Sequence, residues 1–180
     1  MGLRPLHAVV LALLVGPAGC SDTSARSGQE PIMSITVTST AFSEGGRIPS
    51  KFTCDSDNVS PPLTWRGLPA NTTALALVVD DPDAPRGTYV HWVLLDLPAD
   101  LTSLGENLTP PPGTVQAKNS AGRATYFGPC PPSGTHHYRF TIYALSAPTD
   151  LPPGAPLDEA LKAIKTFTIA QGRLTGLYSR

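Results

Sequence analysis

The chain carries little charge, and no charge of one sign is concentrated in it. Of its 180 residues, 13 are Lys or Arg and 14 are Asp or Glu, which gives a formal net charge of −1. A surface that binds nucleic acid usually shows a basic run or a basic patch interleaved with aromatic residues, and neither occurs here. The sequence therefore argues against a nucleic-acid partner. A hydrophobic content of 41% also argues against disorder over the body of the chain.

Motifs of two common hydrolase classes are missing as well. The sequence has no His-Glu-x-x-His helix and no pair of cysteines at metal-ligand spacing, so it predicts no metal site and no cofactor. It also lacks the Gly-x-Ser-x-Gly turn that exposes a nucleophilic serine. We therefore expect a protein that is not an enzyme. A zinc-dependent hydrolase built on two histidines and an aspartate is the least favoured alternative.

The N-terminal apolar run is too short to span a bilayer. It covers residues 8–15, follows Arg4 and is succeeded by several small residues. This pattern is typical of a secretory signal peptide, here residues 1–19. The remainder of the chain is therefore expected to act outside the cytoplasm.

Cys20 directly follows Ala18 and Gly19, which resembles the cleavage site of bacterial lipoproteins, where the cysteine becomes the lipidated N-terminus. Pro17 stands where that site usually has Leu. This interpretation predicts a lipoprotein of the bacterial cell membrane. The alternative is ordinary cleavage after Ala18 or Ala25, which would leave a soluble exported protein.

Cysteine is scarce, with three in the chain. If Cys20 is lipidated, Cys54 and Cys130 form an even pair in an oxidising compartment, which favours a disulfide between them. The alternative is two separate buried thiols, and the separation of their Cα atoms distinguishes the two.

The remaining sequence divides into a tether and one domain. Residues 20–30 are small, polar and aperiodic, which is typical of a flexible linker. Residues 31–180 are numerous enough to bury about two-thirds of their unfolded surface around a single core. The 20 prolines and 16 glycines of the chain predict short strands joined by many loops.

Apolar and β-branched residues predict strands at 35–39, 74–79, 89–97 and 138–145. A further strand is predicted at 166–178. One amphipathic helix is expected, because Leu157, Leu161 and Ile164 fall on one helical face. Many short strands with one or two short peripheral helices favour a mainly β fold, a sandwich of antiparallel sheets.

Two histidines and two aspartates lie beside the predicted strands. Strand alternation places His136 on the face of Tyr138 and turns His137 to the opposite face. Alternation also predicts that His91 shares a face with Tyr89 and Val93, opposite Trp92. Asp81 and Asp83 flank Pro82 at the end of the strand at 74–79. Such a set can bind an anion, because a protonated His donates to phosphate while an Asp behind it fixes the tautomer.

These residues belong to a longer set of spaced motifs over residues 33–180. The set comprises Asp80-Asp81-Pro82-Asp83-Ala84-Pro85, His91-Trp92-Val93, Gly128-Pro129-Cys130-Pro131-Pro132, His136-His137-Tyr138 and the closing Gly176-x-Tyr178-x-Arg180. The set resembles that of the phosphatidylethanolamine-binding proteins, in particular their bacterial branch, often described as Raf-kinase-inhibitor-like.

The resemblance implies a β-sandwich of two antiparallel sheets with a small anion-accepting pocket at one end. On the matching positions, the pocket would be lined by Asp81, His91, Pro129, His136 and Tyr138, with Asp83 and Gly128 adjacent. The family pattern also suggests a cis peptide bond between Ala84 and Pro85.

Three functions remain open at this point. The leading one is binding, in which His91 and His136 hold a phosphate or phosphoethanolamine-like anion or a phospholipid head group and Asp81 accepts a bond from an ammonium. The second is inhibition of an extracytoplasmic protease or another protein partner. The third is the zinc-dependent hydrolase described above.

Overall fold

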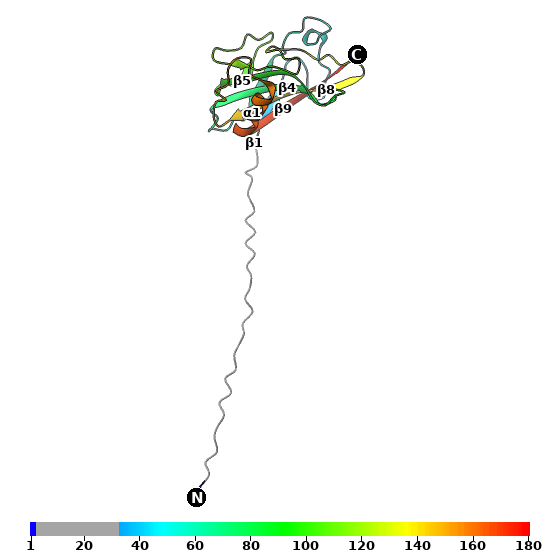
Figure 1. Ribbon diagram of the computed structural model, residues 1–180. Helices are drawn as coiled ribbons and strands as arrows, with labels where there is room; N and C mark the ends of the chain where they lie inside the picture. Colours follow the sequence, from blue (N-terminus) through cyan, green and yellow to red (C-terminus); the bar gives the residue numbers. More distant parts are fainter. Residues whose placement is uncertain (3–32) are drawn as a thin grey trace. The chain divides into compact units, whose positions relative to one another are not determined.

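The computed structural model describes residues 1–2 and 33–180 (Figure 1). The predictions for Cys20 and for the tether at 20–30 lie outside the described residues, as does nearly all of the predicted signal peptide. Within the described residues, no helix is both long and apolar enough to cross a membrane.

The larger sheet has six strands in the order β1-β9-β8-β4-β5-β7, and β4, β5, β8 and β9 form its body (Figure 1). Its strands are β1 (Met33–Ser34), β4 (Ala74–Asp81), β5 (Tyr89–Pro98), β7 (Val115–Gln116), β8 (Thr135–Leu145) and β9 (Thr168–Ser179). All pairs are antiparallel except β1 with β9. The predicted strand at 74–79 is confirmed as β4, and its continuous apolar run is explained because both of its faces are buried.

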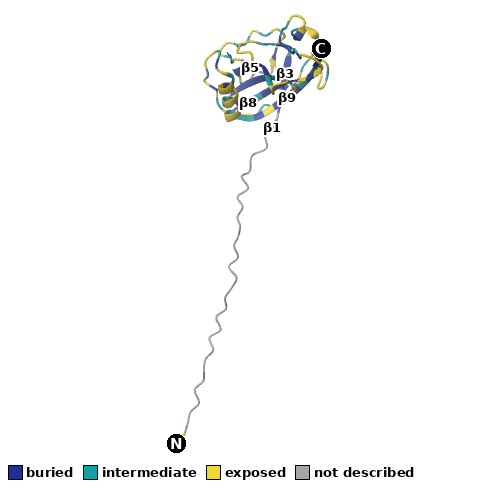
Figure 2. Cartoon of the chain, turned by 45° about the vertical axis from the view of Figure 1, so that its right-hand side comes forward, coloured by how far each residue is buried: buried dark blue, intermediate teal, exposed yellow. Residues whose placement is uncertain are grey.

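The smaller sheet has three strands, β2 (Thr36–Thr38), β3 (Leu63–Arg66) and β6 (Ser103–Leu104), in the order β2-β3-β6. Its inward residues, including Val37 and Trp65, pack in one core with Leu75, Leu77 and Phe140 of the larger sheet. This core lies between the two sheets, so the predicted β-sandwich is confirmed. Figure 2 shows the buried strands within a surface of exposed loops.

Helix α1 (Leu157–Phe167) packs on the other face of the larger sheet, where a second core forms. The predicted helix is confirmed, but its predicted face is partly wrong. Ala160 and Ile164 are buried, whereas Leu161 is 37% exposed. The contact is centred on Ala160 because a small side chain lets the helix approach the sheet closely, and this turns Leu161 outward. The second helical element is a single 3₁₀ turn, η1 (Ser50–Phe52).

Candidate functional site

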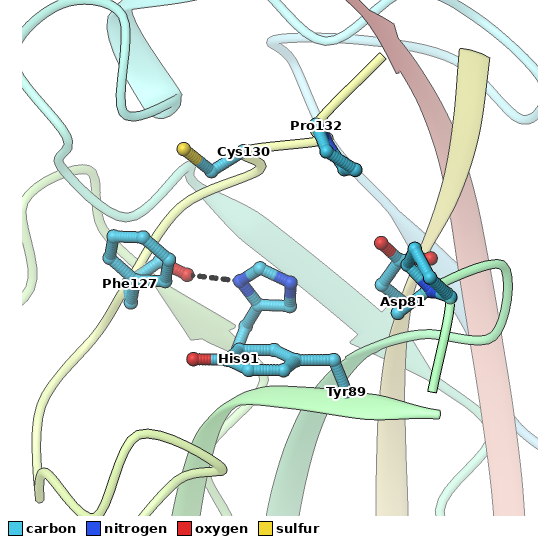
Figure 3. Close-up of a pocket in the computed structure, with 8 residues that line it drawn as sticks. Asp81, Tyr89, His91, Phe127, Cys130 and Pro132 are labelled. Atoms are coloured by element: carbon cyan, nitrogen blue, oxygen red, sulfur yellow. Dashed lines mark hydrogen bonds between the residues drawn. The ribbon is translucent and has the colours of Figure 1, made fainter. Parts of the chain in front are cut away.

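A cavity of about 260 Å³ opens where β4 ends and β5 begins (Figure 3). A loop that includes Phe127, Cys130 and Pro132 forms its third side. The complete lining is Asp81, Ala84, Pro85, Tyr89, His91, Phe127, Cys130 and Pro132. The walls are therefore mostly apolar, with a carboxylate and an imidazole facing the space between them.

Asp81 is the buried carboxylate of the cavity. Its Oδ2 accepts a hydrogen bond from Nδ1 of His136 at 2.7 Å, and its Oδ1 accepts one from the backbone N–H of Asp83 at 2.8 Å. Asp81 is 3% exposed and His136 is 7% exposed, so this hydrogen-bonded pair is largely removed from water. Because a carboxylate only accepts here, Nδ1 of His136 carries a proton and fixes the orientation of the ring.

His91 reaches the cavity through an irregularity that strand alternation does not predict. The pairing of β4 with β5 shifts register at this point, so His91 is the extra residue of a β-bulge. The expected grouping with Val93 is wrong, because Val93 packs in the core under the helix. The His91 ring instead meets Tyr138 with centroids 5.4 Å apart, on the face that also carries Trp92.

One nitrogen of His91 is committed to the protein and the other faces the cavity. Nδ1 donates to the carbonyl oxygen of Phe127 at 2.7 Å, and the two rings are stacked. Figure 3 shows Nε2 on the opposite side of the ring, toward Asp81. Burial lowers the pKa of His91, an effect that the Phe127 carbonyl partly offsets. At neutral pH, Nε2 therefore presents a lone pair to the cavity.

Tyr138 stands between the two histidines, and its ring centroid lies 5.4 Å from that of His91 and 6.5 Å from that of His136. Its side chain is fully buried, and its hydroxyl has no hydrogen-bond partner within the described part of the chain. Burial first, and the charge of Asp81 second, raise the pKa of Tyr138. The hydroxyl thus stays protonated.

A second His–Asp pair lies nearby at the surface. Asp83 accepts hydrogen bonds from the backbone N–H of His137 at 2.8 Å and from its Nδ1 at 2.7 Å. These bonds, the backbone one above all, lower the pKa of Asp83. The opposite orientations predicted for His136 and His137 match the buried and exposed positions that the two residues take in β8.

The expected cis peptide bond before Pro85 is wrong, because the described residues contain no cis peptide. The chain turns there with the N–H of Gly87 bonded to the carbonyl of Ala84 at 3.0 Å. Pro85 is the second residue of this turn, a position that a trans proline suits. Just before this turn, the chain is held by the bond from the N–H of Asp83 to Asp81 and by the bonds from His137 to Asp83.

Backbone groups of Gly128 and Pro129 anchor the loop at 127–132 to residues 54–58. The N–H of Gly128 donates to the side chain of Asn58 at 2.8 Å, and the carbonyl of Pro129 accepts from the N–H of Cys54 at 3.1 Å. Cys54 and Cys130 are joined by a disulfide with their Cα atoms 5.5 Å apart. The loop is therefore fastened to the segment that follows η1.

The cavity differs in composition from the expected one. Of the five residues expected to line it, Asp81 and His91 do so, whereas Pro129, His136 and Tyr138 lie outside the lining. His136 supports Asp81, Tyr138 packs on His91, and Pro129 fixes the loop. Phe127 was not among the lining residues expected from the sequence. Its position directly before Gly128, which begins one of the spaced motifs, is the feature of the sequence that could have indicated it. Among residues 33–180, no three His, Cys, Asp or Glu side chains gather as a possible metal site.

Comparisons with known proteins agree with this architecture. A family model described as phosphatidylethanolamine-binding protein matches residues 38–179. A relative from Methanothermobacter thermautotrophicus, described as a UPF0098 protein, is 47% identical over 144 residues, which cover 78% of this chain and 95% of the relative. A Mycobacterium tuberculosis relative whose name describes it as a lipoprotein, LppC, is 41% identical over 193 aligned positions, which cover 97% of this chain and 95% of the relative.

Two solved structures are similar. One is a phosphatidylethanolamine-binding protein homologue from Chlamydia trachomatis, 34% identical with a TM-score of 0.76, and the match covers 82% of this chain and 98% of that one. The other is YbcL of E. coli, described as a member of the mammalian PEBP family, 31% identical with a TM-score of 0.76 over 82% of this chain and 99% of that one. The chain therefore belongs to the phosphatidylethanolamine-binding protein family.

Proposed function

We propose that this chain is an exported binding protein that holds a small phosphate-bearing anion, such as phosphate or phosphoethanolamine, in the cavity beside Asp81. The observation that supports this best is a set of polar groups with unused hydrogen-bonding capacity around an otherwise apolar cavity. They are the carboxylate of Asp81 and Nε2 of His91. Sites for small molecules typically combine apolar walls with a few convergent polar groups.

The size of the cavity restricts the ligand. At about 260 Å³, it lies below the range of roughly 300–1,000 Å³ that is typical of sites for drug-sized ligands. A phosphate or a small head group fits this volume, whereas the acyl chains of a lipid do not. The name of the family refers to a lipid, but the part of a lipid that this cavity could hold is its head group.

Replacing His136 tests the proposal. We expect isothermal titration of the full-length protein with phosphoethanolamine at pH 6 to give saturable binding, and His136→Ala to weaken it by about tenfold or more. The reason is that the change removes one of the two donors that hold the carboxylate of Asp81 in position for the ligand, and a tenfold loss of affinity corresponds to about 1.4 kcal/mol.

His137→Ala is the matched control, because His137 is the next residue of β8 and faces away from His136. Its affinity should stay within about twofold of the unmodified protein, as is usual for surface substitutions. Thermal unfolding of both variants shows whether they remain folded. Unchanged affinity in folded His136→Ala would place the ligand elsewhere, and no heat in the unmodified protein would reject the proposal.

The proposed location is the outer side of a bacterial cell membrane, reached through a lipid on Cys20 and the tether at 20–30. Two observations support it: the signal-like sequence before Cys20, and the alignment of 97% of this chain with a relative named as a lipoprotein. The tether would keep the domain near the membrane surface.

Cys20→Ser is expected to move the protein from the membrane fraction to the soluble fraction of an expressing bacterium, because one lipid chain or more is lost from the N-terminus. Metabolic labelling with a palmitate analogue should mark the unmodified protein and not the variant. Ser21→Ala is the control and should remain labelled. An unlabelled wild-type protein in the soluble fraction would instead indicate ordinary signal-peptide cleavage.

A further inference from the structure

The groups that face the cavity accept more hydrogen bonds than they donate. A carboxylate offers about four lone-pair positions, and the described residues use two of those on Asp81, through His136 and Asp83. Nε2 of His91 is a second acceptor, because the proton of the neutral imidazole is on Nδ1, which donates a hydrogen bond to the carbonyl oxygen of Phe127. The hydroxyl of Tyr138 is a donor, but it is fully buried and lies outside the lining.

No Lys or Arg side chain is among the lining residues of the cavity. Proteins that bind a fully ionised phosphate usually supply such a cation, because charge-assisted bonds to the anion are about twice as strong as neutral ones. A fully ionised anion would instead lie against the carboxylate of Asp81, and the guanidinium of Arg180, which lies beside Cys130 of the lining, is already paired with Asp55. An anion without a proton is therefore a poor fit.

The titratable groups around this space come from all the elements that surround it. Asp81 comes from β4, Tyr89 and His91 from β5, and His136 and Tyr138 from β8. Asp83 and His137 pair with each other at the surface, and Asp80 pairs with Arg139 on the opposite face of the sheet. Arg180 pairs with Asp55 and lies 3.6 Å from Sγ of Cys130. Of the groups that line the cavity, His91 is the histidine whose protonation would itself alter anion binding.

We propose that the cavity selects oxyanions that still carry an acidic proton, namely phosphate or a phosphomonoester as its monoanion, whose P–O–H group donates to the carboxylate of Asp81. This inference rests on the proposed function and narrows it, because sulfates and phosphodiesters carry no such proton near neutral pH. Asp81 thereby becomes a specificity-determining residue.

The test compares three small anions by isothermal titration of the full-length protein at pH 6 and pH 8. Methyl phosphate can be protonated, whereas methyl sulfate and dimethyl phosphate cannot. For a second phosphate pKa of about 6, the monoanion fraction falls about 50-fold between these pH values, and the affinity for methyl phosphate should fall with it. At pH 6, the other two anions should bind at least about tenfold more weakly, which corresponds to 1.4 kcal/mol.

The anions also separate the possible causes of a pH effect. If methyl sulfate gains affinity at pH 6 as strongly as methyl phosphate does, the histidines provide the charge and the inference is wrong, although the proposed function stands. Equal binding of glycerophosphoethanolamine at both pH values, at the affinity of methyl phosphate at pH 6, would show that an ammonium is the donor and would also overturn it. No binding of any of these anions would overturn the proposed function as well.

Two substitutions assign the preference to a residue. Asp81→Asn turns part of the acceptor into a donor, so the preference for methyl phosphate over methyl sulfate should fall by about tenfold or more. Tyr138→Phe removes a buried hydroxyl that lies outside the lining, so the ratio of the two affinities should stay unchanged. An unchanged ratio in folded Asp81→Asn would contradict the inference. If that variant does not fold, the comparison of anions on the unmodified protein still decides.

Discussion

Removal of the disulfide between Cys54 and Cys130 is expected to lower the free energy of unfolding by about 4 kcal/mol. The two cysteines are 76 positions apart in the sequence, so the bridge closes a long loop in the unfolded chain. Closing such a loop removes conformational entropy from the unfolded state, and this stabilises the folded state by comparison. Urea unfolding of the double variant Cys54→Ala, Cys130→Ala measures the difference.

The folded structure should survive this change, because other contacts hold the same region. Tyr178 donates to Asp55 at 2.7 Å and Arg180 donates to the same carboxylate at 2.9 Å, next to Cys54 in the chain. As a control, the reduced wild-type protein should unfold at the same urea concentration as the double variant, and a reductant should not affect the variant. A loss of less than about 1 kcal/mol would show that the bridge constrains the unfolded chain far less than its loop length implies.

The strands and one half of the site could be predicted because the alternation within β8 is regular. β8 pairs with β9 without a shift of register from Thr135 to Ala144, and with β4 from Arg139 to Leu145. His136 and Tyr138 therefore take the faces that a period of two gives them. The end of β4 was predictable for a similar reason, since its apolar run ends where Asp80 and Asp81 begin.

The position of His91 could not be predicted, because it depends on how β5 pairs with β4 and on the contact of its ring with the loop at 127–132. The bulge at His91 is a property of how β5 pairs with β4, and the sequence of β5 alone does not contain it. The partner of the His91 ring is a backbone carbonyl of Phe127, a group that every residue type possesses. The helix face was mispredicted for a related reason: the close packing of Ala160 on the sheet, and not the spacing of the leucines, turned Leu161 to solvent.

Substitution of Gly128 by Ala is expected to destabilise the protein by about 1–3 kcal/mol and to weaken ligand binding by about tenfold or more. A Cβ atom at this position would lie 2.3 Å from the backbone carbonyl oxygen of Phe52 and 2.9 Å from Cα of Thr53. Both are main-chain atoms, so no side-chain rotation relieves the overlap and the loop at 127–132 must move. Because the Phe127 carbonyl fixes the His91 ring, this movement releases the imidazole that faces the cavity.

Gly105→Ala is the matched control, because a Cβ atom there would have no neighbour within 4 Å and the residue has no positive φ. Its unfolding free energy should change by less than about 0.5 kcal/mol, with no change in affinity. Thermal unfolding and phosphoethanolamine titration of both variants make the comparison. Since Gly128 does not line the cavity, full affinity in a destabilised Gly128→Ala protein would mean that the loop only covers the site. Loss of affinity beyond the loss of stability would show instead that the loop, through Phe127, sets the tautomer and position of His91 on which ligand binding depends.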